Sequence, residues 1–85
     1  MSPEEIKAAR HHLNLSLWQL ATVLGFTGVG RREKMHEIET GHRQLGEPSR
    51  RLLIAYLEGY RSRDWDDIVS GKLRPTTEES FRSRS

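Results

Sequence analysis

Residues 16–41, SLWQLATVLGFTGVGRREKMHEIETG, decide the fold of this chain. The first part spaces apolar residues at helical intervals behind Ser16, a good N-cap, and ends at Gly25, a residue suited to a left-handed C-cap. The second part places Met35 and Ile38 three residues apart on one helical face, with charged residues on the other faces. We therefore predict two short amphipathic helices joined by a glycine-bearing turn.

The second of these helices, over about 30–40, is densely basic. A short helix that packs on its predecessor and turns a charged face outward is typical of a helix-turn-helix, whose second helix fits the major groove of DNA. Arginine can bond guanine O6 and N7 through its fork, and free amides at a helix start favour phosphate. We expect the base-reading residues to be Arg31, Arg32, Glu33 and His36. We expect phosphate contacts from Lys34, His42, Arg43, Gln44 and Arg50.

Charge distribution agrees with this hypothesis better than net charge does. The 85 residues carry a net charge of only +2, but residues 31–63 hold eight Arg or Lys against five Glu. A solvated surface face is the alternative interpretation of this cluster. The basic cluster therefore supports DNA binding only in combination with the helix-turn-helix pattern around it.

The size and composition of the chain argue against several other classes of protein and site. A chain of 85 residues holds one core, and the absence of cysteine excludes disulfides, thiolate zinc sites and cysteine nucleophiles. No apolar run approaches the roughly 20 residues that a bilayer requires, so we expect a cytoplasmic protein without membrane association. His11 and His12 are adjacent and point roughly 100° apart on a helix, so they cannot chelate one metal together. We expect no metal site, cofactor, small-molecule ligand or catalytic residue, and hence no enzyme.

Three more helices complete the prediction. Ser2, Pro3 and two glutamates make a good start for a helix that runs to about His12, and Asn14 is expected to close it in a left-handed conformation. A helix from about 47 carries apolar residues at helical spacing, and a short fifth helix follows Asp64 as its cap. No alternating β-branched runs are present. The prediction is an all-α compact bundle of about five short helices over 1–71, followed by a flexible tail over 72–85.

The last helix has an apolar edge that suggests self-association. Because helix 30–40 and the loop after it are assigned to DNA, a homodimer contact is expected from the C-terminal part. The candidates are Tyr60, Trp65, Ile68 and Val69. Equally, Trp65 could cap the domain's own core, and the sequence leaves this alternative open. Trp18 poses a similar choice: we favour packing under a neighbouring element over exposure to a partner or to DNA.

Two segments resemble a known family. IKAARHHLNLSLWQLATVLGF is similar to the opening of lambda-repressor-like, Cro/XRE-type helix-turn-helix domains, and EIETGHRQLGEPSRRLL is similar to their later part. The resemblance covers about residues 4–57 and implies their fold and their DNA-binding function. It also implies that Arg10 and Glu39 form a buried salt bridge between the first and third helices. Leu17 departs from the family's usual glutamine, and the turn before Met35 is about four residues longer than usual.

The resulting hypothesis is a sequence-specific regulator of transcription that binds double-stranded DNA. We expect a homodimeric repressor, or autorepressor, of a phage or other mobile-element operon, with an inverted-repeat operator whose half-sites lie about one helical turn apart. The alternative is an antitoxin-like module whose main ligand is a partner protein and whose tail orders on that partner.

Overall fold

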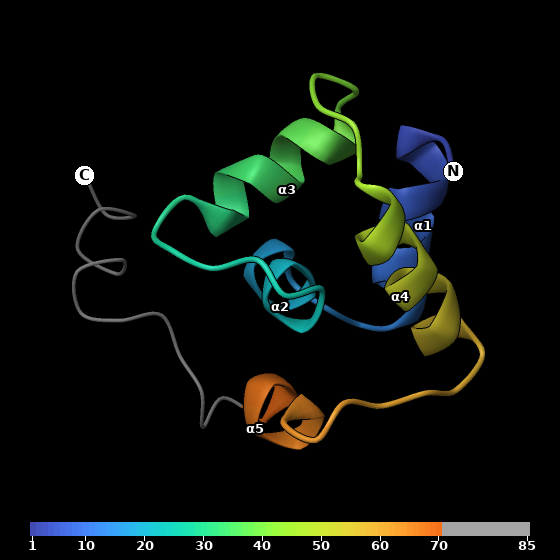
Figure 1. Ribbon diagram of the computed structural model, residues 1–85, viewed down its shortest axis with the longest axis vertical. Coiled ribbons are helices and arrows are strands. Elements are labelled where there is room, and N and C mark those ends of the chain that lie inside the picture. Colours follow the sequence, from blue (N-terminus) through green and yellow to red (C-terminus); the bar gives the residue numbers. More distant parts are fainter. Residues whose placement is uncertain (71–85) are drawn as a thin grey trace.

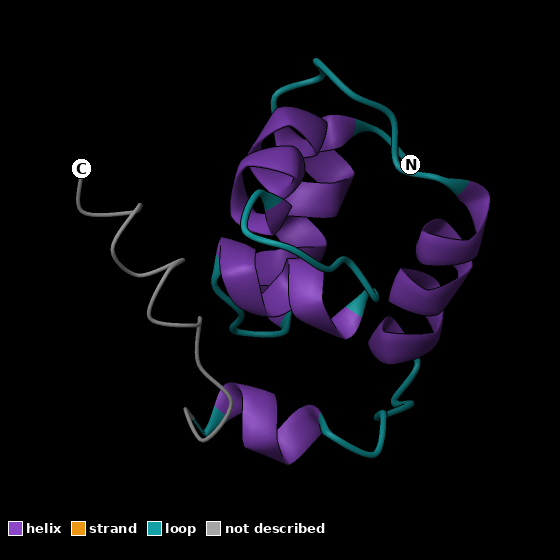
Figure 2. Cartoon of the chain, turned by 60° about the vertical axis from the view of Figure 1, so that its left-hand side comes forward, coloured by secondary structure: helices purple, strands orange, loops and turns teal. Residues whose placement is uncertain are grey.

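The chain folds into five helices with no strand in the part described. The computed structural model describes residues 1–70, and Figures 1 and 2 show helices and loops only over that range. The helices are α1 Pro3–His12, α2 Leu17–Val23, α3 Arg31–Glu39, α4 Glu47–Leu57 and α5 Trp65–Val69. The all-α prediction is confirmed, and the expected tail over 72–85 lies outside the described residues.

Matching caps start the first two helices. The amide of Glu5 donates to Ser2 Oγ at 3.1 Å, and the Ser2 amide donates back to the Glu5 carboxylate at 2.8 Å. Ser16 and Gln19 repeat this reciprocal arrangement at the start of α2, with the same two distances. Each pair satisfies two backbone donors that a helix start would otherwise leave open. Local sequence therefore fixes where both helices begin.

Left-handed residues end the same two helices. Asn14 has φ of 58°, the conformation expected of it, and Gly25 follows α2 with φ of 91°. The amide of Phe26 then donates to the Ala21 carbonyl at 2.9 Å, so the chain leaves α2 through a closed turn. The chain is thereby turned away from α2 before α3 begins, as Figure 1 shows.

One core joins all five helices. Its fully buried side chains come from α2, α3, α4 and α5 and include Leu20, Met35, Ile38, Leu53, Tyr56 and Ile68. The Tyr56 hydroxyl donates to the Val23 carbonyl at 2.6 Å, which ties α4 to α2. Burial raises the pKa of Tyr56, so this hydroxyl stays a protonated donor. In Figure 1, α2 occupies the middle of the molecule, and it packs against α3 and α5.

The short α5 belongs to this core. Gln19 of α2 donates from Nε2 to the Ile68 carbonyl at 3.3 Å, and the Trp65 ring lies 5.0 Å from the Tyr56 ring, centroid to centroid. Asp64 precedes α5, but its side chain makes no cap hydrogen bond, contrary to expectation. Packing against α2 rather than capping therefore holds α5, which lies at the lower edge of the molecule in both views.

Among residues 1–70, no helix combines the length and the apolar character needed to cross a bilayer.

Candidate nucleic-acid interface

Helix α3 has one buried face and one open face. Met35 and Ile38 are buried against the core, whereas Arg32, Glu33, Lys34 and His36 are all exposed. Within residues 1–70, the side chains of Arg32 and Lys34 make no hydrogen bond or ion pair. Two unpaired cationic side chains thus lie on the exposed face of a helix whose opposite face is buried in the core.

Arg31 differs from its neighbour in sequence. Its Nε donates to the Gly28 carbonyl at 3.0 Å, and a terminal nitrogen donates to Thr22 Oγ1 at 3.1 Å. Its guanidinium carbon also lies 5.0 Å from the centroid of the Trp18 ring, within range of a cation–π contact. Contrary to the expectation that it reads bases, Arg31 is directed toward α2 and braces the turn. Trp18, in turn, is partly covered, as the sequence favoured.

The first backbone amides of α3 have no hydrogen-bond acceptor within the helix. Gly30 is the N-cap and provides no side-chain hydrogen bond, and the first intrahelical bond runs from the Lys34 amide to the Gly30 carbonyl at 3.0 Å. The amides of residues 31–33 precede that bond and have no acceptor within the helix. Such amides carry partial positive charge, so they add to the basic character of this end.

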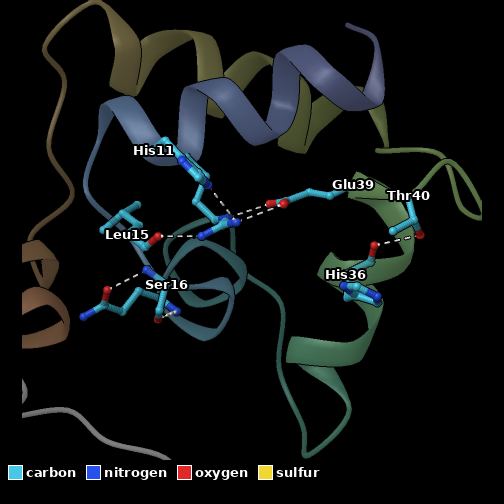
Figure 3. A network of polar contacts seen from close by, with 8 residues as sticks. His11, Leu15, Ser16, His36, Glu39 and Thr40 are labelled. Carbon is cyan, nitrogen blue, oxygen red and sulfur yellow. Dashed lines mark hydrogen bonds and ion pairs between the residues drawn. The ribbon is translucent and has the colours of Figure 1, made fainter.

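The other end of α3 is tied to α1 by the pair Arg10 and Glu39. Nε of Arg10 donates to Glu39 Oε2 at 2.7 Å, and a second guanidinium nitrogen donates to Oε1 at 3.2 Å. Arg10 also donates to the Leu15 carbonyl at 3.0 Å and has His11 Nε2 at 3.2 Å, as Figure 3 shows. The Glu39 side chain is only 5% exposed, so this bidentate pair is nearly buried. The pairing that the resemblance implied is present.

The loop after α3 holds three of the expected phosphate contacts, all exposed. His42 Nδ1 lies 2.9 Å from Thr40 Oγ1, and Arg43 forms an exposed ion pair with Glu37 at 3.4 Å. Gln44 makes no side-chain hydrogen bond within residues 1–70. Arg43 and Gln44 both line an open hollow of about 360 Å³, and Lys34 lies on its wall as well. The structure thus brings these three polar side chains to one surface depression.

Arg50 is less available than the sequence suggested. It forms an ion pair with Glu47, which also accepts from Arg51 Nε at 3.1 Å. Hydrogen bonds from Arg50 and then from Arg51 hold the pKa of Glu47 below its ordinary value. This pair occupies the Arg50 guanidinium, contrary to the expectation of a free phosphate contact. The spacing of three and four residues from Glu47 was a usable signal for this pairing, but the sequence reasoning did not use it.

Two of the four expected dimer residues are not surface residues. Trp65 is 8% exposed and Ile68 is 1% exposed, because both pack into the protein's own core. The prediction that they form an interface with a second copy is wrong for this reason, and the alternative that Trp65 caps its own core is confirmed. Tyr60 and Val69 are 52% and 38% exposed, respectively.

Within residues 1–70, no group of three or more His, Asp or Glu side chains lies close enough to hold a metal ion. A second hollow of about 390 Å³ lies beside the C-terminal end of α3 and is lined by apolar residues together with Arg43, Gln44 and Arg50.

The sequence did not predict that Thr22 is a partner of Arg31. No local spacing indicated this contact, because it spans nine residues.

Comparisons of the chain with models of known protein families, with curated proteins and with solved structures found no match. The functional inference therefore depends on the sequence pattern and on the geometry of α3.

Proposed function

We propose that this protein is a sequence-specific DNA-binding regulator of transcription that inserts the N-terminal half of α3 into the major groove. The observation that supports this most is the exposed pair Arg32 and Lys34, which has no partner within residues 1–70 on a helix whose other face is buried. Free cations cost little to bring to a phosphate backbone, since no existing ion pair must break. In this proposal α2 and α3 act as the helix-turn-helix.

The exposed residues of α3 divide into two roles. Arg32 reads a guanine through two parallel hydrogen bonds, and Glu33 beside it accepts from a cytosine amine. Lys34 contacts phosphate and, with Arg43 and Gln44 around the same hollow, fixes the register on the duplex. His36, one turn further along the exposed face, extends the reading surface.

The aspartates of the described residues lie away from the proposed interface. Asp64, Asp66 and Asp67 lie around α5, and α2 packs between α5 and α3. Of the three glutamates on α3, Glu39 is paired with Arg10 and Glu37 with Arg43.

We propose further that the protein binds as a homodimer and represses its own operon or a neighbouring one by occupying an inverted repeat. Tyr60 and Val69 are the two candidate contacts that stay on the surface. Deletion from residue 62 onward is a poor test, because it would remove Trp65 and Ile68 from the core. Sedimentation of Val69→Asp tests the contact instead: the variant is expected to be monomeric, and a dimer unchanged by it contradicts this interface.

The function itself is tested by selecting bound sequences from a random duplex pool at near-physiological salt. We expect a recovered site that is palindromic, with half-sites about one helical turn apart. Recovery of no preferred sequence, or of a preference that persists when Arg32 and Lys34 are both replaced by alanine, would contradict the proposal.

A further inference from the structure

The turn between α2 and α3 displays an apolar side chain beside the proposed base-reading residues. Val29 is 40% exposed and stands between Gly28, which has φ of 90°, and Gly30. A Cβ placed on either glycine would meet no neighbouring atom within 4 Å, so the tip of the turn is open around Val29. Val29 precedes Arg32 by only three residues and lies at the open end of α3.

This turn is held in place at both of its ends. At the first end, the Phe26 amide donates to Ala21, and the Phe26 ring packs against the core. At the second end, Arg31 donates to the Gly28 carbonyl while its guanidinium lies over Trp18 and bonds Thr22. Val29 sits between these anchors. The backbone on both sides of Val29 is therefore held against α2 before any partner arrives.

We infer that Val29 is a specificity-determining residue that recognises the C5-methyl group of a thymine, and that Arg31 is the residue that positions it. The inference rests on the proposed function, since it requires α3 to enter the major groove. There the thymine methyl is the apolar group that a base pair displays, and apolar side chains are its ordinary partners. Val29 is the one exposed large apolar residue of the turn and of α3.

Isolated exposed apolar residues are common on protein surfaces, so exposure alone would not select Val29. Two further features do. Its turn is anchored by contacts from a residue of α3 itself, and the unpaired cations Arg32 and Lys34, which would draw DNA to this end, follow it in the first turns of α3. A valine held there loses little side-chain freedom on binding, because β-branched side chains have few rotamers.

The test uses the full-length protein and the duplex recovered by selection. Each thymine is replaced singly by deoxyuridine, which removes the methyl group and leaves the hydrogen-bonding edge intact. Binding of the unsubstituted protein is expected to weaken about fourfold at one thymine per half-site, the factor that corresponds to about 0.8 kcal/mol for one buried carbon group. Val29→Ala is expected to bind the thymine and uracil duplexes alike at that position.

A matched control is Thr27→Ala, which truncates another exposed β-branched residue of the same turn and should keep the full uracil effect. Arg31→Lys tests the positioning role: it retains the charge, so the salt dependence of binding should persist, while the distinction between thymine and uracil is reduced. An equal uracil effect in Val29→Ala and in the unsubstituted protein overturns the inference, as does a selected site without thymine.

These outcomes are separable from failure of the proposed function. A selected site whose recognition depends on Arg32, but whose uracil derivatives never distinguish Val29→Ala, rejects the Val29 inference alone. Failure to select any sequence rejects both.

Discussion

The two ends of α3 differ in charge and in how their charged side chains are paired. At the C-terminal end, Glu39 is held by Arg10, and Glu37 is paired with Arg43. At the N-terminal end, Arg32 and Lys34 have no partner within residues 1–70, although Glu33 stands between them in the sequence. The carboxylates of the C-terminal end are thus paired, whereas at the N-terminal end Arg31 bonds α2 and Arg32 and Lys34 are available to a ligand.

The number of charged residues on a helix therefore does not measure the charge that is available for binding. A paired cation must give up a hydrogen-bonded carboxylate before it can meet phosphate, whereas a free one gives up only water. The buried pair at one end also fixes the angle at which the other end projects. Loss of the buried pair should therefore affect stability, and loss of Arg32 or Lys34 should affect binding.

The largest expected effect is that of Glu39→Ala on stability. The substitution leaves the Arg10 guanidinium partly buried without its carboxylate, which should lower the free energy of unfolding by about 3–5 kcal/mol. Chemical denaturation followed by circular dichroism measures this loss. Glu33→Ala, at an exposed position of the same helix, is the matched control and should change the unfolding free energy by less than about 0.5 kcal/mol. Equal effects of the two substitutions would remove the distinction between the ends.

The next largest effect is that of Arg32→Ala on recognition. Loss of a two-bond guanine contact should weaken binding to the selected site by about 1–3 kcal/mol and hardly change binding to random duplex. Thermal unfolding should be unaffected, because Arg32 is exposed and makes no hydrogen bond or ion pair within residues 1–70. Fluorescence anisotropy with both duplexes gives the measurement.

Arg63→Ala is the control for Arg32→Ala, since it removes the same residue type from an exposed position before α5. A similar loss in Arg32→Ala on selected and random duplexes would show that Arg32 contacts the backbone instead of a base.

A smaller effect is expected from Arg43→Ala. It should weaken binding to all sequences similarly and flatten the dependence of log K on log salt by about one unit, as for one phosphate contact. The ion pair with Glu37 competes with that contact, so Glu37→Gln should strengthen binding to all duplexes slightly. A change in sequence preference for either variant would contradict the assignment.

The smallest effect concerns pH and the start of α4. Because the pKa of Glu47 lies below its ordinary value of 4.5 in the folded protein, its contribution to stability is present above the unfolded pKa and is lost as pH falls through the folded pKa. Glu47→Gln should therefore reduce the acid dependence of stability below about pH 4.5. Denaturation at a series of pH values, with NMR titration of the Glu47 carboxyl, checks this. A carboxyl that titrates at or above its ordinary value would contradict the pairing with Arg50 and Arg51.

Local sequence was sufficient to predict where α1 and α2 begin and end, because the interactions that set these ends act over a few residues. Ser2 with Glu5, and Ser16 with Gln19, form caps at a spacing of three, and Asn14 adopts its left-handed conformation through local geometry. The Arg10 and Glu39 pairing was also expected, but only through the resemblance, since the two residues lie 29 positions apart. The pairing of Glu47 with two arginines was local as well, and could have been predicted from its spacing.

Which charged and aromatic side chains stay exposed and unpaired depends on tertiary packing. Arg31 and Arg32 are adjacent and chemically identical, yet the first bonds α2 and the second stays open, because α2 lies on one side of α3. Tryptophan is a residue type that is common at interfaces, but Trp65 is buried in the protein's own core, where its ring lies beside that of Tyr56. The direction of a side chain depends on what packs beside its helix, and those neighbours come from distant parts of the chain.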